Sequence, residues 1–133
     1  MIQFLVCVGV VIGFFTVLQG DDASLPNPSL KDLHEQRCEL LSEDLIAIQK
    51  NHANGNASTS SLDEAKIRLI LAEAEAANNE ATRQLKRVEA INLLRIIVDR
   101  SQKQVEQGVA SPASYRDAQV RLIETQISFH TGG

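Results

Sequence analysis

The sequence QKNHANGNASTSSLDEAKIRLI at residues 49–70 and the sequence QKQVEQGVASPASYRDAQVRLI at residues 102–123 are two versions of one pattern. They align without a gap at an offset of 53 residues, and both open with Gln-Lys and close with Arg-Leu-Ile. The positions shared in between are Gly55/Gly108, Ala57/Ala110, Ser58/Ser111, Ser61/Ser114 and Ala65/Ala118. Self-similarity at a fixed offset predicts that one structural unit occurs twice in the chain.

Each version of the pattern predicts a helix, a short turn and a second helix. Glycine adopts positive φ readily and asparagine tolerates it, so turns are expected at the shared glycines. The predicted turns are Gly55, Asn56 and Ala57 in the first copy and Gly108, Val109 and Ala110 in the second. After each turn a serine stands three residues before a carboxylate, which is the spacing of a capping box. Ser61 and Ser114 are therefore the predicted helix caps.

The segments around the turns carry apolar residues at helical spacing. They predict helices over about residues 29–53, 62–106 and 115–129. The central one is expected to be a single long helix, because residues 62–107 contain no Gly or Pro. The alternative is a break at Asn78-Asn79, two poor helix formers, which folds the chain into a four-helix bundle. The predicted fold class is all-α, with long antiparallel helical hairpins that pack like a coiled coil.

The first twenty residues contain no charged side chain and are followed at once by Asp21-Asp22. Residues 4–18 are apolar apart from Gly and Thr16, which indicates a signal peptide or an N-terminal membrane anchor. A cleaved signal is favoured, since the apolar core is shorter than the roughly 20 residues of a spanning helix. The expected product is an exported helical hairpin domain over residues 21–133, in the periplasm or elsewhere in the cell envelope.

The charge balance and the motifs exclude several function classes. The chain has 13 basic and 17 acidic residues, a net charge of −4, and its Lys and Arg residues form no basic stripe, so nucleic acid is not an expected partner. There is no glycine-rich phosphate loop and no nucleophile with a partnered histidine. We therefore expect no enzyme and no cofactor, and membrane contact only through the N-terminal segment.

His34 and Cys38 stand four residues apart, so they face one side of the first helix and could share a metal. Zinc normally takes three or four protein ligands, and His52 and His130 are far away in sequence. The expectation is an ordinary histidine beside a half-buried cysteine. The alternative function is a small helical bundle that binds a ligand or metal through His34, Cys38 and nearby carboxylates.

Several carboxylates lie among the apolar residues of the predicted helices, where they are expected to form a solvated face with pairing to nearby Lys and Arg. They are Asp63, Glu64, Glu73, Glu75 and Glu89.

Residues 107–126, which contain the second turn and the start of the helix after it, resemble the periplasmic helix tips of TolC-type outer-membrane efflux proteins. In that family a helix ends at Gly, and the returning helix carries an Ala-Gln or Ala-Arg pair about ten residues later, which Gly108 and Ala118 match. The resemblance covers residues 85–129 well and the remainder weakly. Members carry the hairpin twice, but their two hairpins are separated by membrane-spanning β-strands, for which an offset of 53 residues leaves no room.

The resemblance implies a hairpin of an α-helical tunnel whose tip docks on a periplasmic adaptor. Gly108, Val109 and Ala110 would form that docking tip, and Asp117 and Ala118 would open the returning helix. The predicted function is an exported, non-catalytic protein with a structural or protein-interaction role linked to transport. Its expected partner is a second copy or another coiled-coil or adaptor protein. A third interpretation is a fragment of a family member with no role of its own.

Overall fold

The computed structural model describes residues 27–132, and 84% of these residues lie in four α-helices. The helices are α2 (Leu30–Ala53), α3 (Thr59–Ala76), α4 (Glu80–Glu106) and α5 (Pro112–Thr131). The described residues contain no strand, so the all-α prediction is confirmed. The predicted signal peptide or anchor at residues 1–20 lies outside the described residues.

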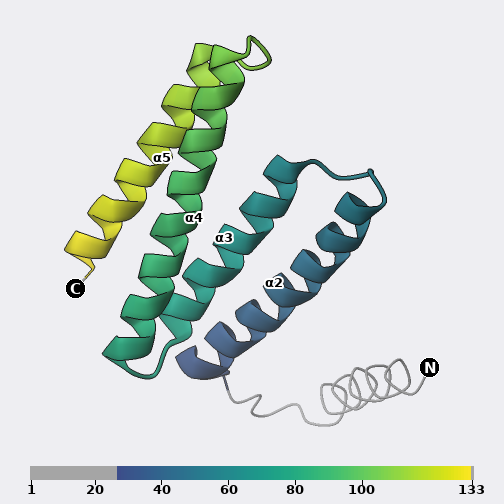
Figure 1. The fold of residues 1–133 in the computed structure, drawn as a ribbon. Coiled ribbons are helices and arrows are strands. Elements are labelled where there is room, and N and C mark those ends of the chain that lie inside the picture. Colours follow the sequence, from purple (N-terminus) through teal and green to yellow (C-terminus); the bar gives the residue numbers. More distant parts are fainter. Residues whose placement is uncertain (1–26, 133) are drawn as a thin grey trace.

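The four helices form one layer in chain order. α2 packs on α3, α3 on α4 and α4 on α5, and no other pair of these helices makes backbone contact. Figure 1 shows that neighbouring helices run in opposite directions and that α2 and α5 lie at the two edges of the layer. Each outer helix therefore has one helical neighbour, whereas α3 and α4 have two.

The prediction of one continuous helix over residues 62–106 is wrong. α3 ends at Ala76 and α4 begins at Glu80, so the break falls at Asn78-Asn79. Asn79 has an extended backbone and caps α4, because its Oδ1 accepts a hydrogen bond of 2.8 Å from the backbone amide of Thr82. An asparagine side chain that serves the next helix in this way stabilises the break. Folding back also lets the two halves cover each other's apolar residues, which a straight helix does not allow.

The buried core is small and belongs to the two central helices. Its residues are Ala65, Ile67, Ile70, Ala72, Ala74, Ala90 and Leu94. α2 and α5 contain no buried residue. At about 100° per residue, Ile67, Ile70 and Ala74 fall on one side of α3 and Ala65 and Ala72 on the opposite side. α3 is thus covered by a neighbour on both sides, and its many alanines allow those neighbours to approach closely.

The helix ends follow the 53-residue offset of the sequence. α2 ends at Ala53 and α4 at Glu106, a difference of 53 positions. α3 begins at Thr59 and α5 at Pro112, which is again a difference of 53 positions. The helix ends on either side of the two turns are therefore spaced by the same offset as the matching sequence positions.

Candidate functional site

The turn between α4 and α5 is held by backbone hydrogen bonds that close the end of α4. The amide of Gly108 donates to the carbonyl of Val105 at 3.0 Å, and the amide of Val109 donates to the carbonyl of Gln104 at 2.9 Å. Together these bonds form a Schellman motif, in which the residue after the helix takes a left-handed conformation. Gly108 has a φ of +73°, which is why glycine is required there.

The turn between α2 and α3 has the same construction. The amide of Gly55 donates to the carbonyl of His52 at 3.0 Å, and the amide of Asn56 donates to the carbonyl of Asn51 at 2.8 Å. Gly55 has a φ of +77°. The predicted turn residues of the two copies therefore lie in two turns of matching backbone geometry.

The helices that follow these turns start three residues earlier than predicted. The N-caps are Ser58 and Ser111, and their side chains accept hydrogen bonds from the backbone amides of Ser61 and Ser114. The prediction of Ser61 and Ser114 as helix caps is wrong, because these residues lie inside the first helical turn and donate to the caps. In the second copy Pro112 supplies the first helical residue, a position at which its missing N–H costs nothing.

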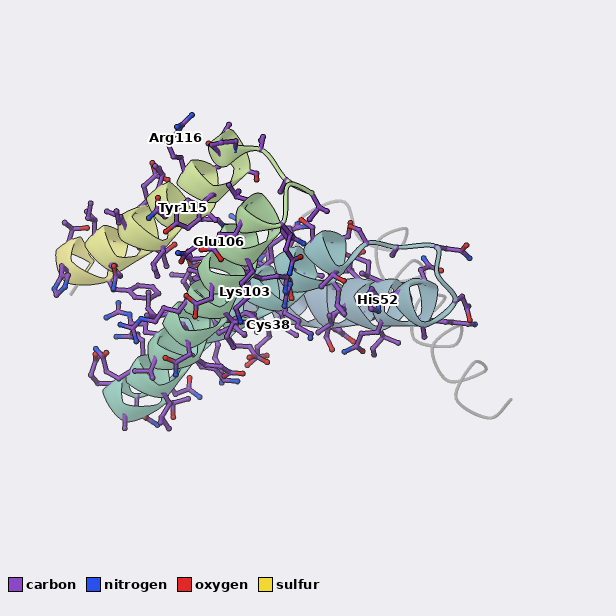
Figure 2. The ribbon with its side chains drawn as sticks, turned by 45° about the horizontal axis from the view of Figure 1, so that its top comes forward. Cys38, His52, Lys103, Glu106, Tyr115 and Arg116 are labelled. Carbon is purple, nitrogen blue, oxygen red and sulfur yellow. The ribbon has the colours of Figure 1, made fainter. Side chains whose placement is uncertain are left out.

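Val109 stands at the tip of the α4–α5 turn with its side chain 72% exposed. Charged residues flank it: Figure 2 shows Lys103 and Glu106 on the last turns of α4 and Arg116 near the start of α5. The tip therefore presents an exposed apolar residue on a hydrogen-bonded turn.

The structure does not build a metal site at His34 and Cys38. His34 lines a pocket together with Arg87 and Phe129, whereas Cys38 lines a different pocket together with Asn78. Burial, and then the charge of Glu73, raise the pKa of the Cys38 thiol, which disfavours the thiolate that binds metals. Among residues 27–132 no three His, Cys, Asp or Glu side chains gather as metal ligands.

One of the carboxylates expected to be solvated is buried. Asp63 is only 6% exposed and accepts a hydrogen bond from the guanidinium of Arg100 on α4. The sequence carries a signal that could have revealed this, because Asp63 shares the helical face of Ile67, Ile70 and Ala74. Buried carboxylates require a partner, and Arg100 supplies it across the interface between the central helices.

The remaining carboxylates pair mainly with other helices rather than within their own. Glu64 pairs with Arg121 of α5, Glu75 with Arg37 of α2, and Glu73 with Lys86 of α4. Glu89 is the exception, since it pairs with Lys86 one turn before it on α4. Three of these pairs therefore link neighbouring helices, and their exposed side chains make each a modest contribution to stability.

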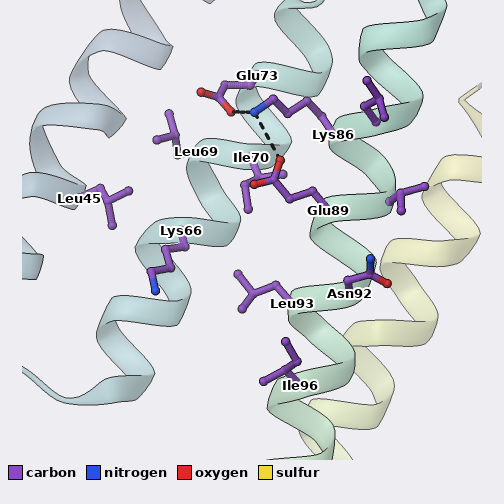
Figure 3. Close-up of a pocket in the computed structure, with 12 residues that line it drawn as sticks. Leu45, Lys66, Leu69, Ile70, Glu73, Lys86, Glu89, Asn92, Leu93 and Ile96 are labelled. Atoms are coloured by element: carbon purple, nitrogen blue, oxygen red, sulfur yellow. Dashed lines mark ion pairs between the residues drawn. The ribbon is translucent and has the colours of Figure 1, made fainter.

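An open, largely apolar groove of about 690 Å³ lies between α3 and α4 (Figure 3). Ile70 and Leu93 face it, and Leu45 closes it from α2. At one end Lys86 stands between Glu73, at 2.8 Å, and Glu89, at 3.4 Å. Burial lowers the pKa of Lys86, but the hydrogen bond to Glu73 outweighs it and raises that pKa overall. The groove therefore combines apolar surface with a cluster of paired charges at one end.

No family model, curated protein or solved structure matches this chain. Of the helices over residues 27–132, none is long and apolar enough to cross a lipid bilayer.

Proposed function

We propose that this chain is an exported, non-catalytic protein made of a duplicated helical hairpin, similar to the periplasmic hairpins of TolC-type efflux proteins. In this proposal the α4–α5 turn docks on a partner of a cell-envelope transport system, a protein with a helical hairpin of the adaptor kind. Gly108, Val109 and Ala110 form the contact, as the family resemblance implies.

The observation that carries the proposal is the exposure of Val109, 72% of whose side chain lies in water at the tip of a hydrogen-bonded turn. Fully burying a valine side chain is favourable by roughly 1.5–3 kcal/mol. Because Gly108 and the capped start of α5 already hold the turn in one conformation, docking requires little further ordering of the backbone. The matching turn of the first copy has the polar Asn56 at the position of Val109, which favours the second turn as the docking tip.

A photo-reactive amino acid in place of Val109 tests the contact in cells of the source organism. Adducts are collected after illumination and the attached protein is identified by mass spectrometry. We expect an adduct with an envelope protein that contains a helical hairpin. The matched control carries the same photo-reactive residue in place of Val88, which is also exposed, at 55%, but lies on the side of α4.

The docking proposal fails if the Val109 position yields no adduct or yields the same adducts as the Val88 position. A second variant, Val109→Asp, should remove association with the identified partner while the far-ultraviolet circular dichroism of the chain stays unchanged. Retention of full binding by this variant would also count against the tip.

Export is tested separately by cell fractionation and by the intact mass of the isolated chain. Cleavage after Gly20 predicts a chain that begins at Asp21, recovered from the envelope fraction. A chain that keeps Met1 and stays in the cytoplasmic fraction would contradict export.

A further inference from the structure

The side of α5 that faces away from α4 carries an apolar stripe. Val120, Ile123 and Ile127 are spaced by three and four residues, which places them on one helical face. Their side chains are 50%, 53% and 55% exposed. Leu122, toward the opposite side, is partly covered. The structure describes no helix after α5, so this stripe lies open at the edge of the layer.

The stripe on α5 has a counterpart on α3 that is covered. Subtracting the 53-residue offset from Val120, Ile123 and Ile127 gives Ile67, Ile70 and Ala74. These three residues are buried, at 1%, 8% and 4% exposure, on the side of α3 that α4 covers. α5 thus repeats the face to which α4 binds, and no helix among residues 27–132 covers it.

α2 matches α4 at the same offset, just as α5 matches α3. Its exposed residues Leu33 and Leu40 match Lys86 and Leu93 at the same offset. In α4 these residues lie along α3: Lys86 pairs with Glu73, and Leu93 lines the groove together with α3 residues. This flank of α2, whose Leu33 and Leu40 also border Arg68 and Leu71 of α3, therefore repeats the face of α4 that packs on α3. No helix precedes α2 among residues 27–132 to cover the flank.

We propose that the open stripe of α5 is covered by α2 of a second copy of this chain, packed as α4 packs on α3. The contact continues the interface between the two central helices from one copy to the next. It goes beyond the docking of the tip, because it lies on the edges of the layer and not at the α4–α5 turn.

The charges of the two faces are complementary. In the central interface Asp63 of α3 pairs with Arg100 of α4. The matching positions are Arg116 on α5 and Ala47 on α2, and Asp44 lies one helical turn before Ala47. The signs are exchanged, but an acidic residue again stands near a basic one. In its own copy Asp44 is half exposed and 3.9 Å from Arg68, so its carboxylate is available to a second partner.

One difference makes the proposed contact weaker than the central one. Arg37 of α2 stands where α4 has Ala90, which is fully buried. A long side chain at that position keeps the helices further apart, so we expect association that depends on protein concentration. Because different faces of the two copies meet, the contact is head to tail and generates rings or open chains rather than a closed two-fold dimer.

Disulfide trapping tests the pairing directly. Ile70 and Leu93 line the same groove in the central interface, so Ile123 of one copy should lie near Leu40 of the next. In a chain with Cys38→Ser, one preparation carries Ile123→Cys and another carries Leu40→Cys. We expect a disulfide-linked dimer when the two preparations are mixed under mild oxidation, and little from either one alone.

Two results of the trapping would overturn the proposal. The absence of a linked dimer in the mixture would show that the faces do not meet. An equal yield from the Ile123→Cys chain alone would show that α5 meets α5 in a two-fold contact instead.

A charge placed in the stripe should weaken association without unfolding the chain. By sedimentation equilibrium, we expect Ile123→Glu to raise the concentration for half-association by at least about tenfold. The control is Ile96→Glu on α4, because Ile96 is also an isoleucine with 53% exposure but lies outside the proposed contact. Equal weakening by both variants, or by neither, would contradict the assignment of the face.

Discussion

The guanidinium of Arg100 on α4 donates a hydrogen bond to the carboxylate of Asp63, the buried acid at the start of α3. The bond ties the two central helices together close to the α2–α3 turn. At the matching positions α5 carries Arg116 and α2 carries Ala47, with Asp44 one helical turn before it.

Removal of Arg100 should destabilise the fold, because it leaves the Asp63 carboxylate buried without its partner. We expect Arg100→Met to lower the free energy of unfolding in urea by about 1–3 kcal/mol, less than a fully buried pair would lose since the Arg100 side chain is 39% exposed. Arg95→Met is the control, because Arg95 is exposed on the same helix and has no ion pair within the described residues. Equal losses in the two variants would show that the pair does not stabilise the interface.

The two turn glycines should be sensitive to substitution for a backbone reason alone. No atom lies within 4 Å of a Cβ added at Gly55 or Gly108, so a new side chain meets no neighbour. Their positive φ angles nevertheless disfavour an L side chain. We expect Gly55→Ala and Gly108→Ala each to cost about 1–2 kcal/mol in the free energy of unfolding. Gly108→Asn should cost less, since asparagine tolerates this conformation better, and a neutral Gly108→Ala would contradict the described turn.

The position of the first cap can be tested with two serines of the same segment. Ser58→Ala removes the acceptor for the amide of Ser61 and should lower the free energy of unfolding by about 1 kcal/mol. Ser61→Ala leaves that acceptor in place and loses only the hydroxyl contact of 2.9 Å with Ser58, so its cost should be smaller. Urea unfolding of the two variants gives the comparison. A larger loss of unfolding free energy in Ser61→Ala than in Ser58→Ala would indicate that Ser61 is the cap, as the sequence predicts.

The ion pairs of Lys86 predict a specific dependence of stability on pH. Its pKa is raised in the folded chain from an ordinary value of 10.5, chiefly by the hydrogen bond to Glu73. A raised pKa means that the contribution is fully present below the unfolded pKa and is lost as the pH rises through the folded one. At pH 7 we expect the free energy of unfolding of the wild type to exceed that of Lys86→Met by about 0.5–1 kcal/mol. This difference should shrink as the pH rises above about 10.5.

Lys66→Met is the control for the pH experiment. Lys66 lines the same groove but has no ion pair in the described part of the chain. Its variant should show no comparable change relative to wild type over the same pH range. A Lys86→Met difference that stays constant to pH 12 would contradict the role of the pair.

The local features of this fold could be predicted from the sequence with good accuracy. The first helix was expected over residues 29–53 and is found at Leu30–Ala53. The sequence predicts turns at Gly55 and Gly108, and both glycines have a positive φ. These features depend on neighbours along the chain, on glycine's freedom and on short-range hydrogen bonds, all of which a sequence displays directly.

The caps were misplaced because two serines compete in each turn. Ser58 and Ser61 both precede possible helical residues, and a capping box at Ser61 satisfied the spacing rule. In the structure Ser58 is the N-cap, so α3 begins about one turn earlier than predicted. The additional turn can pack against the neighbouring helices. The benefit of that extra turn comes from packing, which the spacing rule does not contain.

The sequence by itself determined that the chain is helical and where its glycine turns fall, and it shows matching residues at an offset of 53 positions. Only the tertiary structure decided that α3 and α4 separate at Asn78-Asn79, that Asp63 is buried against Arg100, and that α2 and α5 keep apolar faces exposed at the edges of the layer. The physical reason is that a side chain on one helix becomes buried only when a second helix packs against it. Whether an apolar stripe ends as core or as open surface depends on which helix lies against it, and helical spacing alone does not record that neighbour.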